Sequence, residues 1–253
     1  HMLFDSSRGI KSTTGSNSPF LVSNSTSANQ TNANGLQAIG SDSFTPGSMT
    51  RTNESGDNYV AWQWKANGGT TATNTTGTID SVVQANTTAG FSIVTFTSPA
   101  SGVFSVGHGL GVQPAMVITK SLVGTSNWWT WHKGLTGGNS NSTYIVALER
   151  ISTEASHTTA WGSTGVTPSV FGMQAGNTAV ASKNYLAYCF AEKQGYSKFG
   201  RYAGNGNANG PMIATGFKPA WVVVKRIDAT TNADWICTDN KRGINGANPR
   251  LYL

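Results

Sequence analysis

The chain has 253 residues, of which 38% are hydrophobic, 11% are charged and 30 are glycine. Charged residues make up ~25% of a typical globular domain, so Ser, Thr, Asn and Gly must supply most of the surface polarity here. Disordered chains combine low hydrophobicity with high charge, so this composition excludes general disorder and favours a β protein with many turns.

The net charge of +6 is distributed unevenly. Residues 1–126 carry five basic and five acidic side chains, whereas residues 127–253 carry twelve and six. A basic half favours an anionic partner such as an acidic polysaccharide, although solubility alone also explains it. Nucleic acid fits less well, because there is no basic cluster, basic helix or zinc-finger spacing. We expect no membrane insertion, since no apolar run is long enough to span a bilayer.

In chain order, the expected strands are short apolar runs bounded by Gly, Pro, Asn and Ser. They are rich in β-branched and aromatic residues, and no segment shows a helical period over twelve residues. His1-Met2 resembles a cloning remnant and is left out of the interpretation. The strand candidates are "SPFLVS" (18–23), "NYVAWQWK" (58–65), "FSIVTFT" (91–97), "AMVITK" (115–120), "STYIVALE" (142–149), "NYLAYCFAE" (184–192) and "AWVVVKR" (220–226).

Several of these runs recur in the same order. "DNYVAWQWKANGG" (57–69) returns as "KNYLAYCFAEKQG" (183–195), and Tyr59 and Tyr185 lie 126 positions apart. "HGLGVQPAMVITKS" (108–121) returns as "ATGFKPAWVVVKR" (214–226), with a Trp following each. A spacing above 100 residues is that of a domain rather than of a solenoid repeat. We therefore interpret the chain as a segment of a longer tandem array.

The start and end of the chain match each other as well. "DSSRGI" (5–10) resembles "DNKRGI" (239–244). Aligning the three copies of this region gives two successive columns, each of which holds the equivalent residue from every copy. A strand is also predicted three times, in "SPFLVS", "STYIVA" and "NPRLYL". The two columns hold Phe4, Trp131 and Thr238, followed by Asp5, His132 and Asp239.

These matches predict an all-β protein with two tandem antiparallel β-sandwich modules of jelly-roll, lectin-like form. Residues 3–66 would be a partial first copy, 67–88 a linker and 89–196 the second copy. Residues 197–253 would begin a third copy and complete the first sandwich from the other end of the chain. Alternation places Val60, Trp62 and Trp64 on the core face of their strand, as it does Leu186, Tyr188 and Phe190.

Catalytic signatures are missing from the sequence. There is no Gly-x-Ser-x-Gly elbow, His-Glu-x-x-His motif, phosphate loop or dinucleotide fingerprint. The histidine spacing specifies no metal site, and calcium finds only weak support in scattered acids, so we expect no cofactor. A triad or carboxylate pair assembled across space stays open. Cys189 and Cys237 form no disulfide framework and are expected to be free buried thiols.

Aromatic residues that are not repeated between copies are the better candidates for binding, because a shared core does not require them. Flat aromatic faces bind sugar rings, and neighbouring polar groups orient hydroxyls. The competing interpretation is that these tryptophans are core residues and that the basic side chains protect a sheet edge. The candidate ligand-binding residues are Trp129, Trp131, His132, Trp161, Arg201, Lys225 and Arg226.

Four long stretches resemble one known repeat: "VQANTTAGFSIVTFT" (83–97), "VGHGLGVQPAMVITKS" (106–121), "NYLAYCFAEKQGYSKFGRYAGNGNANGP" (184–211) and "TGFKPAWVVVKR" (215–226). They are similar to an uncharacterised repeat of virion proteins from marine bacteriophages, itself similar to concanavalin-A-like sandwiches. The resemblance covers residues 4–253 and is weakest over 11–50. It implies a virion location in a tail fibre or appendage, other virion proteins as partners, and adhesion to a host.

Three functions remain open. The preferred one is a non-enzymatic virion module that binds a host-surface polysaccharide, and a homotrimer is a possible assembly because β fibres exchange elements. The second is a purely structural spacer repeat. The third is a polysaccharide-degrading hydrolase or lyase.

Overall fold

The structure is a computed structural model that describes residues 2–9, 17–229, 233–241 and 251–252. Strands dominate it, which confirms the expected all-β class. Among the described residues, helix is limited to single turns: η1 (Ser6–Arg8), α1 (Thr50–Asn53) and η2 (Gly138–Ser140).

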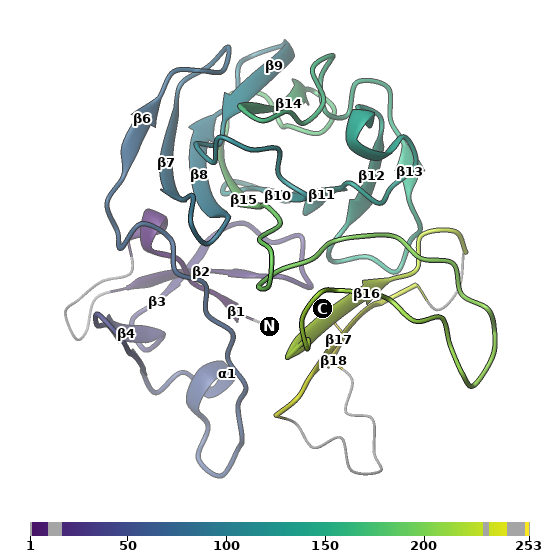
Figure 1. The fold of residues 1–253 in the computed structure, drawn as a ribbon. Coiled ribbons are helices and arrows are strands. Elements are labelled where there is room, and N and C mark those ends of the chain that lie inside the picture. Colours follow the sequence, from purple (N-terminus) through teal and green to yellow (C-terminus); the bar gives the residue numbers. More distant parts are fainter. Residues whose placement is uncertain (1, 10–16, 230–232, 242–250, 253) are drawn as a thin grey trace.

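A large antiparallel sheet of eight strands forms the centre of the molecule (Figure 1). Its longest strands are short apolar runs, as β propensity predicts. The order across the sheet is β13 (Ala155–Ser156), β12 (Tyr144–Ala147), β11 (Trp129–His132), β10 (Met116–Ser121), β15 (Asn184–Phe190), β8 (Phe91–Thr97), β7 (Ser81–Asn86) and β6 (Ala72–Asn74). Residues 67–88, where we expected a linker, thus contain β6 and β7 of this sheet.

One face of the central sheet is covered by a second, two-stranded layer. This layer pairs β9 (Gly102–Gly107) with β14 (Val170–Ala175) along their whole length. Phe104 and Phe171 from the layer meet Phe96 and Tyr185 from the sheet, with ring centroids 5.5–6.2 Å apart from Phe96. These contacts form a sandwich core.

The opposite face is covered by the two ends of the chain. The N-terminal sheet and the C-terminal sheet both pack on it, and Leu21 and Trp235 join a second core with Ile118, Leu186 and Tyr188. The N-terminal sheet holds β1 (Met2–Leu3), β2 (Ser18–Val22) and β3 (Gln30–Asn32), and the C-terminal sheet holds β16 (Trp221–Lys225), β17 (Trp235–Asp239) and β18 (Leu251–Tyr252). A separate pair, β4 (Leu36–Ile39) and β5 (Phe44–Pro46), follows β3.

This arrangement differs from the expected pair of separate modules, which is not confirmed. The central sheet is buried on both faces because β15 is apolar on both: Ala187 and Cys189 face the first core, and Leu186 and Tyr188 face the second. A strand with two apolar faces needs a layer on each side. The terminal pieces supply the second layer, so they pack against the central copy rather than standing apart from it.

The repeated strand appears in the structure as the same hairpin three times. In each instance two successive residues of the first strand pair with two residues of the second. The pairs are Met2–Val22 and Leu3–Leu21 for β1–β2, Trp129–Ala147 and Thr130–Val146 for β11–β12, and Ile236–Tyr252 and Cys237–Leu251 for β17–β18. The first strands align in the columns that the sequence predicted. In the second strands, Val22 and Tyr252 are the fifth residues of the matched run and Ala147 is the sixth, so the register of β11–β12 is shifted by one residue.

Candidate functional site

An open hollow in the surface surrounds Lys133, where β11 leaves the central sheet. The loop from Lys133 to Asn139 lines an open depression of about 550 Å³ together with Gly200 and Arg201. Gly137 and Gly138 have φ values of 90° and 57°, a left-handed conformation that side chains rarely adopt. The glycine-rich sequence "KGLTGGN" therefore lets the loop turn tightly and leaves its backbone accessible.

A second depression of about 220 Å³ shares two of its lining residues, Lys133 and Asn139, with the first. We call the two together the Lys133 depression. The second lobe is lined by Val112, Gln113, Pro114, Ala115, Lys133, Asn139, Ala191, Glu192 and Lys193. Three loops that are distant in sequence therefore meet at Lys133.

Basic side chains dominate the charge of the Lys133 depression. Lys133 forms an ion pair of 2.6 Å with Glu192, and Lys198 lies 3.5 Å from the same carboxylate. Lys193 and Arg201 add two further positive charges to its lining. These four cations outnumber the carboxylates at the depression, so it suits an anionic ligand.

Glu192 stays ionised despite its partial burial. Burial raises its pKa, but hydrogen bonds from Lys133 and the Phe199 amide, together with the nearby ammonium charges, hold the pKa below its usual value. A general acid needs a raised pKa to carry a proton near neutrality. Glu192 is therefore suited to positioning Lys133 rather than to proton transfer.

A second carboxylate, that of Glu154, secures the glycine-rich loop from the side. It accepts a hydrogen bond of 2.8 Å from the Thr136 amide and one of 2.5 Å from the Thr136 hydroxyl. Both carboxylates at the depression are thus occupied by protein donors. The arrangement can bind a ligand through Lys193 and Arg201, while Glu154 and Glu192 hold the surrounding loops.

His132 lies beneath the loop and helps to shape it. Its Nδ1 accepts a hydrogen bond of 2.9 Å from the Gly134 amide, and its ring lies 5.9 Å from that of Phe199. Burial and the positive charge of Lys133 lower the pKa of His132 to about 4. The negative charge of Glu192 acts in the opposite direction but is the smaller effect. The ring is neutral near pH 7, and Nε2 carries the proton because Nδ1 is an acceptor.

The three candidate tryptophans lie elsewhere. Trp131 and Trp161 are completely buried in the first core, and their indole N–H groups donate to the carbonyls of Asn141 and Tyr144, each at 3.0 Å. Trp129 is half-buried, with its ring 5.8 Å from that of His157. Neither Trp131 nor Trp161 presents a free ring face, so the sugar-stacking role expected for them has no exposed surface in this structure.

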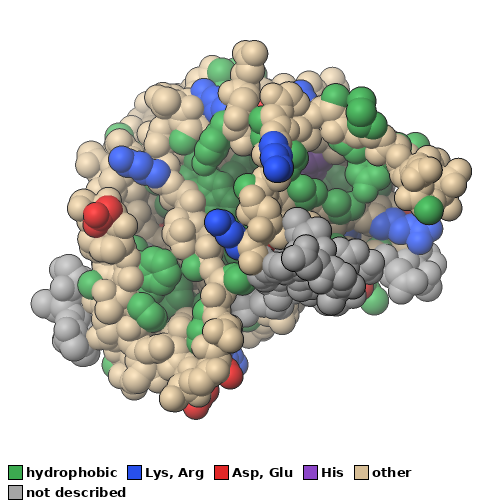
Figure 2. Space-filling model, turned by 60° about the horizontal axis from the view of Figure 1, so that its bottom comes forward, with side chains coloured by type: hydrophobic (Ala, Val, Ile, Leu, Met, Phe, Trp, Pro, Cys, Tyr) green, Lys and Arg blue, Asp and Glu red, His purple; other side chains and the backbone are tan. Residues whose placement is uncertain are grey.

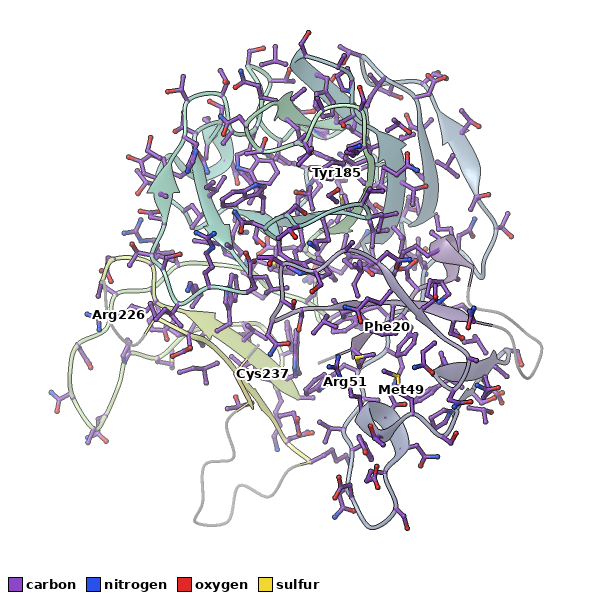
Figure 3. All side chains as sticks on the ribbon, turned by 180° about the vertical axis from the view of Figure 1, so that it is seen from behind. Phe20, Met49, Arg51, Tyr185, Arg226 and Cys237 are labelled. Atoms are coloured by element: carbon purple, nitrogen blue, oxygen red, sulfur yellow. The ribbon has the colours of Figure 1, made fainter. Side chains whose placement is uncertain are left out.

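The remaining candidates separate into two places. Arg201 lines the Lys133 depression, whereas Lys225 is the last residue of β16 and Arg226 follows it, at the outer end of the C-terminal sheet (Figure 3). Lys225 lies over the Trp235 ring and donates to the carbonyls of Arg150 and Ala233. Burial lowers the pKa of Lys225 to about 8, against the charge of Asp234. The structure therefore brings His132 and Arg201 together and leaves Lys225 and Arg226 outside the depression.

Sequence reasoning missed Lys133, Glu192 and Lys193 as parts of one site. The only signal was indirect: a glycine-rich loop follows one strand, "HKGLTGGN" (132–139), and a charged loop follows another, "AEKQG" (191–195). In the described part of the chain, no three or more His, Cys, Asp or Glu side chains are grouped to hold a metal ion. Within the same residues, no helix has the length and apolar character needed to cross a membrane.

Comparison with known proteins places the chain in a family without assigning a role. The chain belongs to a family described as a domain of unknown function, DUF7483, whose model matches residues 1–251. No curated protein matches the chain. No solved structure matches it either.

Proposed function

We propose that this protein is a non-enzymatic binding module of a bacteriophage tail fibre or appendage, and that it binds an anionic polysaccharide of the host surface through the Lys133 depression. The observation that carries the proposal is the basic character of that depression, where Lys133, Lys193 and Arg201 line an open hollow. The virion location and the other virion proteins as partners rest on the sequence resemblance described above.

An open, shallow hollow suits a polymer that passes across it better than it suits a small molecule, which is usually enclosed. Uronic acid carboxylates or sulfate esters along the polymer would pair with the cations, and Arg201 can bind such groups in a bidentate manner. Two exposed aromatic rings lie in the segment that contains Lys193 and Arg201: Tyr196 is 57% exposed and Tyr202 is 48% exposed. Their flat faces give this segment the aromatic surface that we first sought on β11.

A structural spacer is the second candidate function. It is favoured by the recurrence of one antiparallel strand pair at β1–β2, β11–β12 and β17–β18, since a repeated unit suits an extended array. A degrading enzyme is less well supported, because Glu154 and Glu192 are both engaged by protein donors. A spacer predicts that no polysaccharide binds.

Biolayer interferometry with immobilised alginate, dextran sulfate and neutral dextran tests the proposal. We expect the protein to bind the two anionic polymers, more weakly as salt increases, and to ignore neutral dextran. Lys133→Gln and Arg201→Ala should each weaken binding about tenfold, the effect of losing about 1.4 kcal/mol of charge-assisted contact.

Arg51→Ala is the matched control, because Arg51 is an exposed arginine on α1 that lines neither lobe of the depression. Equal losses in Arg51→Ala and Arg201→Ala would indicate non-specific attraction to net charge. If the protein binds neither anionic polymer, the proposed binding function is wrong and the structural spacer is the better interpretation. Release of new reducing ends would instead establish an enzyme.

A further inference from the structure

Residues 58–64 contradict their own sequence pattern in this structure. They match β15 position by position, yet no strand is assigned between Asn53 and Ala72 in the described chain. Tyr59, Val60 and Trp64 are 46%, 42% and 37% exposed, whereas Tyr185 and Leu186, the counterparts of the first two, are 2% and 1% exposed. The segment carries the side chains of a core strand without the burial of one.

The strand β16 has the complementary deficiency. It stands at the edge of the C-terminal sheet, paired with β17 on one side only. Its counterpart in the central sheet, β10, is paired on both sides, with β11 and with β15. An edge with unpaired backbone groups is a template for another strand.

The equivalence of β16 and β10 is geometric as well as sequential. In the C-terminal sheet, Trp221 pairs with Asp239 and Val224 pairs with Ile236. The equivalent residues of the central sheet pair in the same way, Met116 with His132 and Thr119 with Trp129. A lysine follows in each strand, and both lysines lie over a tryptophan ring: Lys120 over Trp128 and Lys225 over Trp235, each 5.8 Å from the ring centroid. The partner that β16 lacks is therefore a counterpart of β15.

That counterpart already lies beside β16. The chain between α1 and β6 passes close to the C-terminal sheet (Figure 1), and the rings of Trp64 and Trp62 lie 5.3 and 6.2 Å from the Trp221 ring. In the central sheet, Met116 and Phe190 are direct partners, and they are the counterparts of Trp221 and Trp64. Figure 2 shows hydrophobic side chains exposed in the hollow middle of the molecule's lower face.

We propose that residues 58–64 pair as an antiparallel strand with the free edge of β16 in the same chain, in the register of β15 on β10. Trp64 then stands opposite Trp221, Trp62 opposite Val223, and Val60 opposite Lys225. The two ends of the chain thereby share one sheet, and the backbone of residues 58–64 joins the ladder of β16. This pairing is independent of the proposed binding role, because neither strand lines the Lys133 depression.

Disulfide trapping with crossed cysteine pairs tests both the partner and the register. The in-register pairs are Ala61→Cys with Val224→Cys and Gln63→Cys with Val222→Cys, the counterparts of Ala187–Thr119 and Cys189–Val117. The out-of-register controls recombine the same four substitutions as Ala61→Cys with Val222→Cys and Gln63→Cys with Val224→Cys. A disulfide needs Cα atoms closer than about 7 Å, which the proposal provides only for the in-register pairs.

After mild oxidation, non-reducing gels should show a compact, faster-migrating monomer for both in-register variants and not for their recombined controls. The native thiols of Cys189 and Cys237 are buried, so the wild-type protein should show no such band. Equal trapping in all four variants, or none, would overturn the proposed register. A cross-linked dimer in place of the monomer would assign the strand to a second copy and overturn pairing within the chain.

Amide hydrogen exchange on the unmodified protein provides the second measurement, because cross-linking can trap a rare conformation. The proposal predicts slowed exchange across residues 58–64 and at β16. Exchange at the rate of free coil over residues 58–64 would overturn it even if a disulfide forms.

Discussion

The Tyr188 hydroxyl donates a hydrogen bond of 2.7 Å to the carboxylate of Asp5, and so joins the start of the chain to the middle of the central sheet. The same carboxylate forms an ion pair of 2.5 Å with Arg8, and both side chains of this pair are only 3% exposed. Burial and the charge of Asp5 raise the pKa of Tyr188, so its hydroxyl remains a donor. The N-terminal layer is therefore held on the sheet by a buried polar contact as well as by apolar packing.

Asp5→Asn should destabilise the protein strongly. It removes the negative charge beside the buried Arg8 guanidinium, and an uncompensated buried charge costs roughly 3–5 kcal/mol. Tyr188→Phe removes only one hydrogen bond to a charged group, at a cost of about 1.5–3 kcal/mol. Urea denaturation of both variants checks this order. Equal losses would show that Arg8 finds other compensation.

Trp131→Ala should affect stability and leave ligand binding unchanged. Deleting a completely buried tryptophan costs roughly 3–5 kcal/mol, because a cavity remains in the first core. Denaturant unfolding gives the loss, and interferometry on the folded variant at low temperature gives the affinity for alginate. A weaker affinity with unchanged stability would restore Trp131 as a binding residue.

His132 should make stability depend on pH in a defined window. Its pKa is lowered from 6.5 in the unfolded chain to about 4 in the fold, so the unfolded state binds a proton that the folded state does not. The stabilising contribution is complete above pH 6.5 and is lost as the pH falls toward 4. His132→Asn keeps an acceptor for the Gly134 amide and cannot be protonated there.

Unfolding free energies of wild type and His132→Asn, measured between pH 7.5 and about 4, check this prediction. The variant should lose less stability over that range. Burial also lowers the pKa of His108, although its hydrogen bond to the Thr167 backbone acts in the opposite direction. His108 therefore contributes to the pH dependence in the same direction, and it is present in both proteins. Parallel curves for the two proteins would contradict the assigned shift.

Cys189 should be unreactive in the folded protein. Its thiol is completely buried, and burial raises its pKa to about 12. Reaction with a thiol reagent requires the thiolate and access to it. Labelling followed by mass spectrometry should find Cys189 unmodified at pH 8 and modified in urea. Rapid labelling without denaturant would mean that β15 opens easily.

The sequence by itself determined the all-β class and the recurrence of one antiparallel strand pair. Both follow from local patterns, because alternation and turn residues specify strands wherever they occur, and Trp128 and Trp235 recur after matching strands. The pairing of Met2, Trp129 and Ile236 with their partner strands bears this out.

Only the tertiary structure decided which layer covers each face and which residues share a site. Local alternation states that a side chain is buried, and it does not state what buries it. Trp131 aligns with Thr238 in the last copy, so its aromatic ring is not required by the repeat, yet it packs in the first core with residues of β9 and β14. Lys133 follows β11, whereas Glu192 and Arg201 follow β15, and these two connections meet at one end of the sheet. Long-range packing rather than spacing along the chain brings them there.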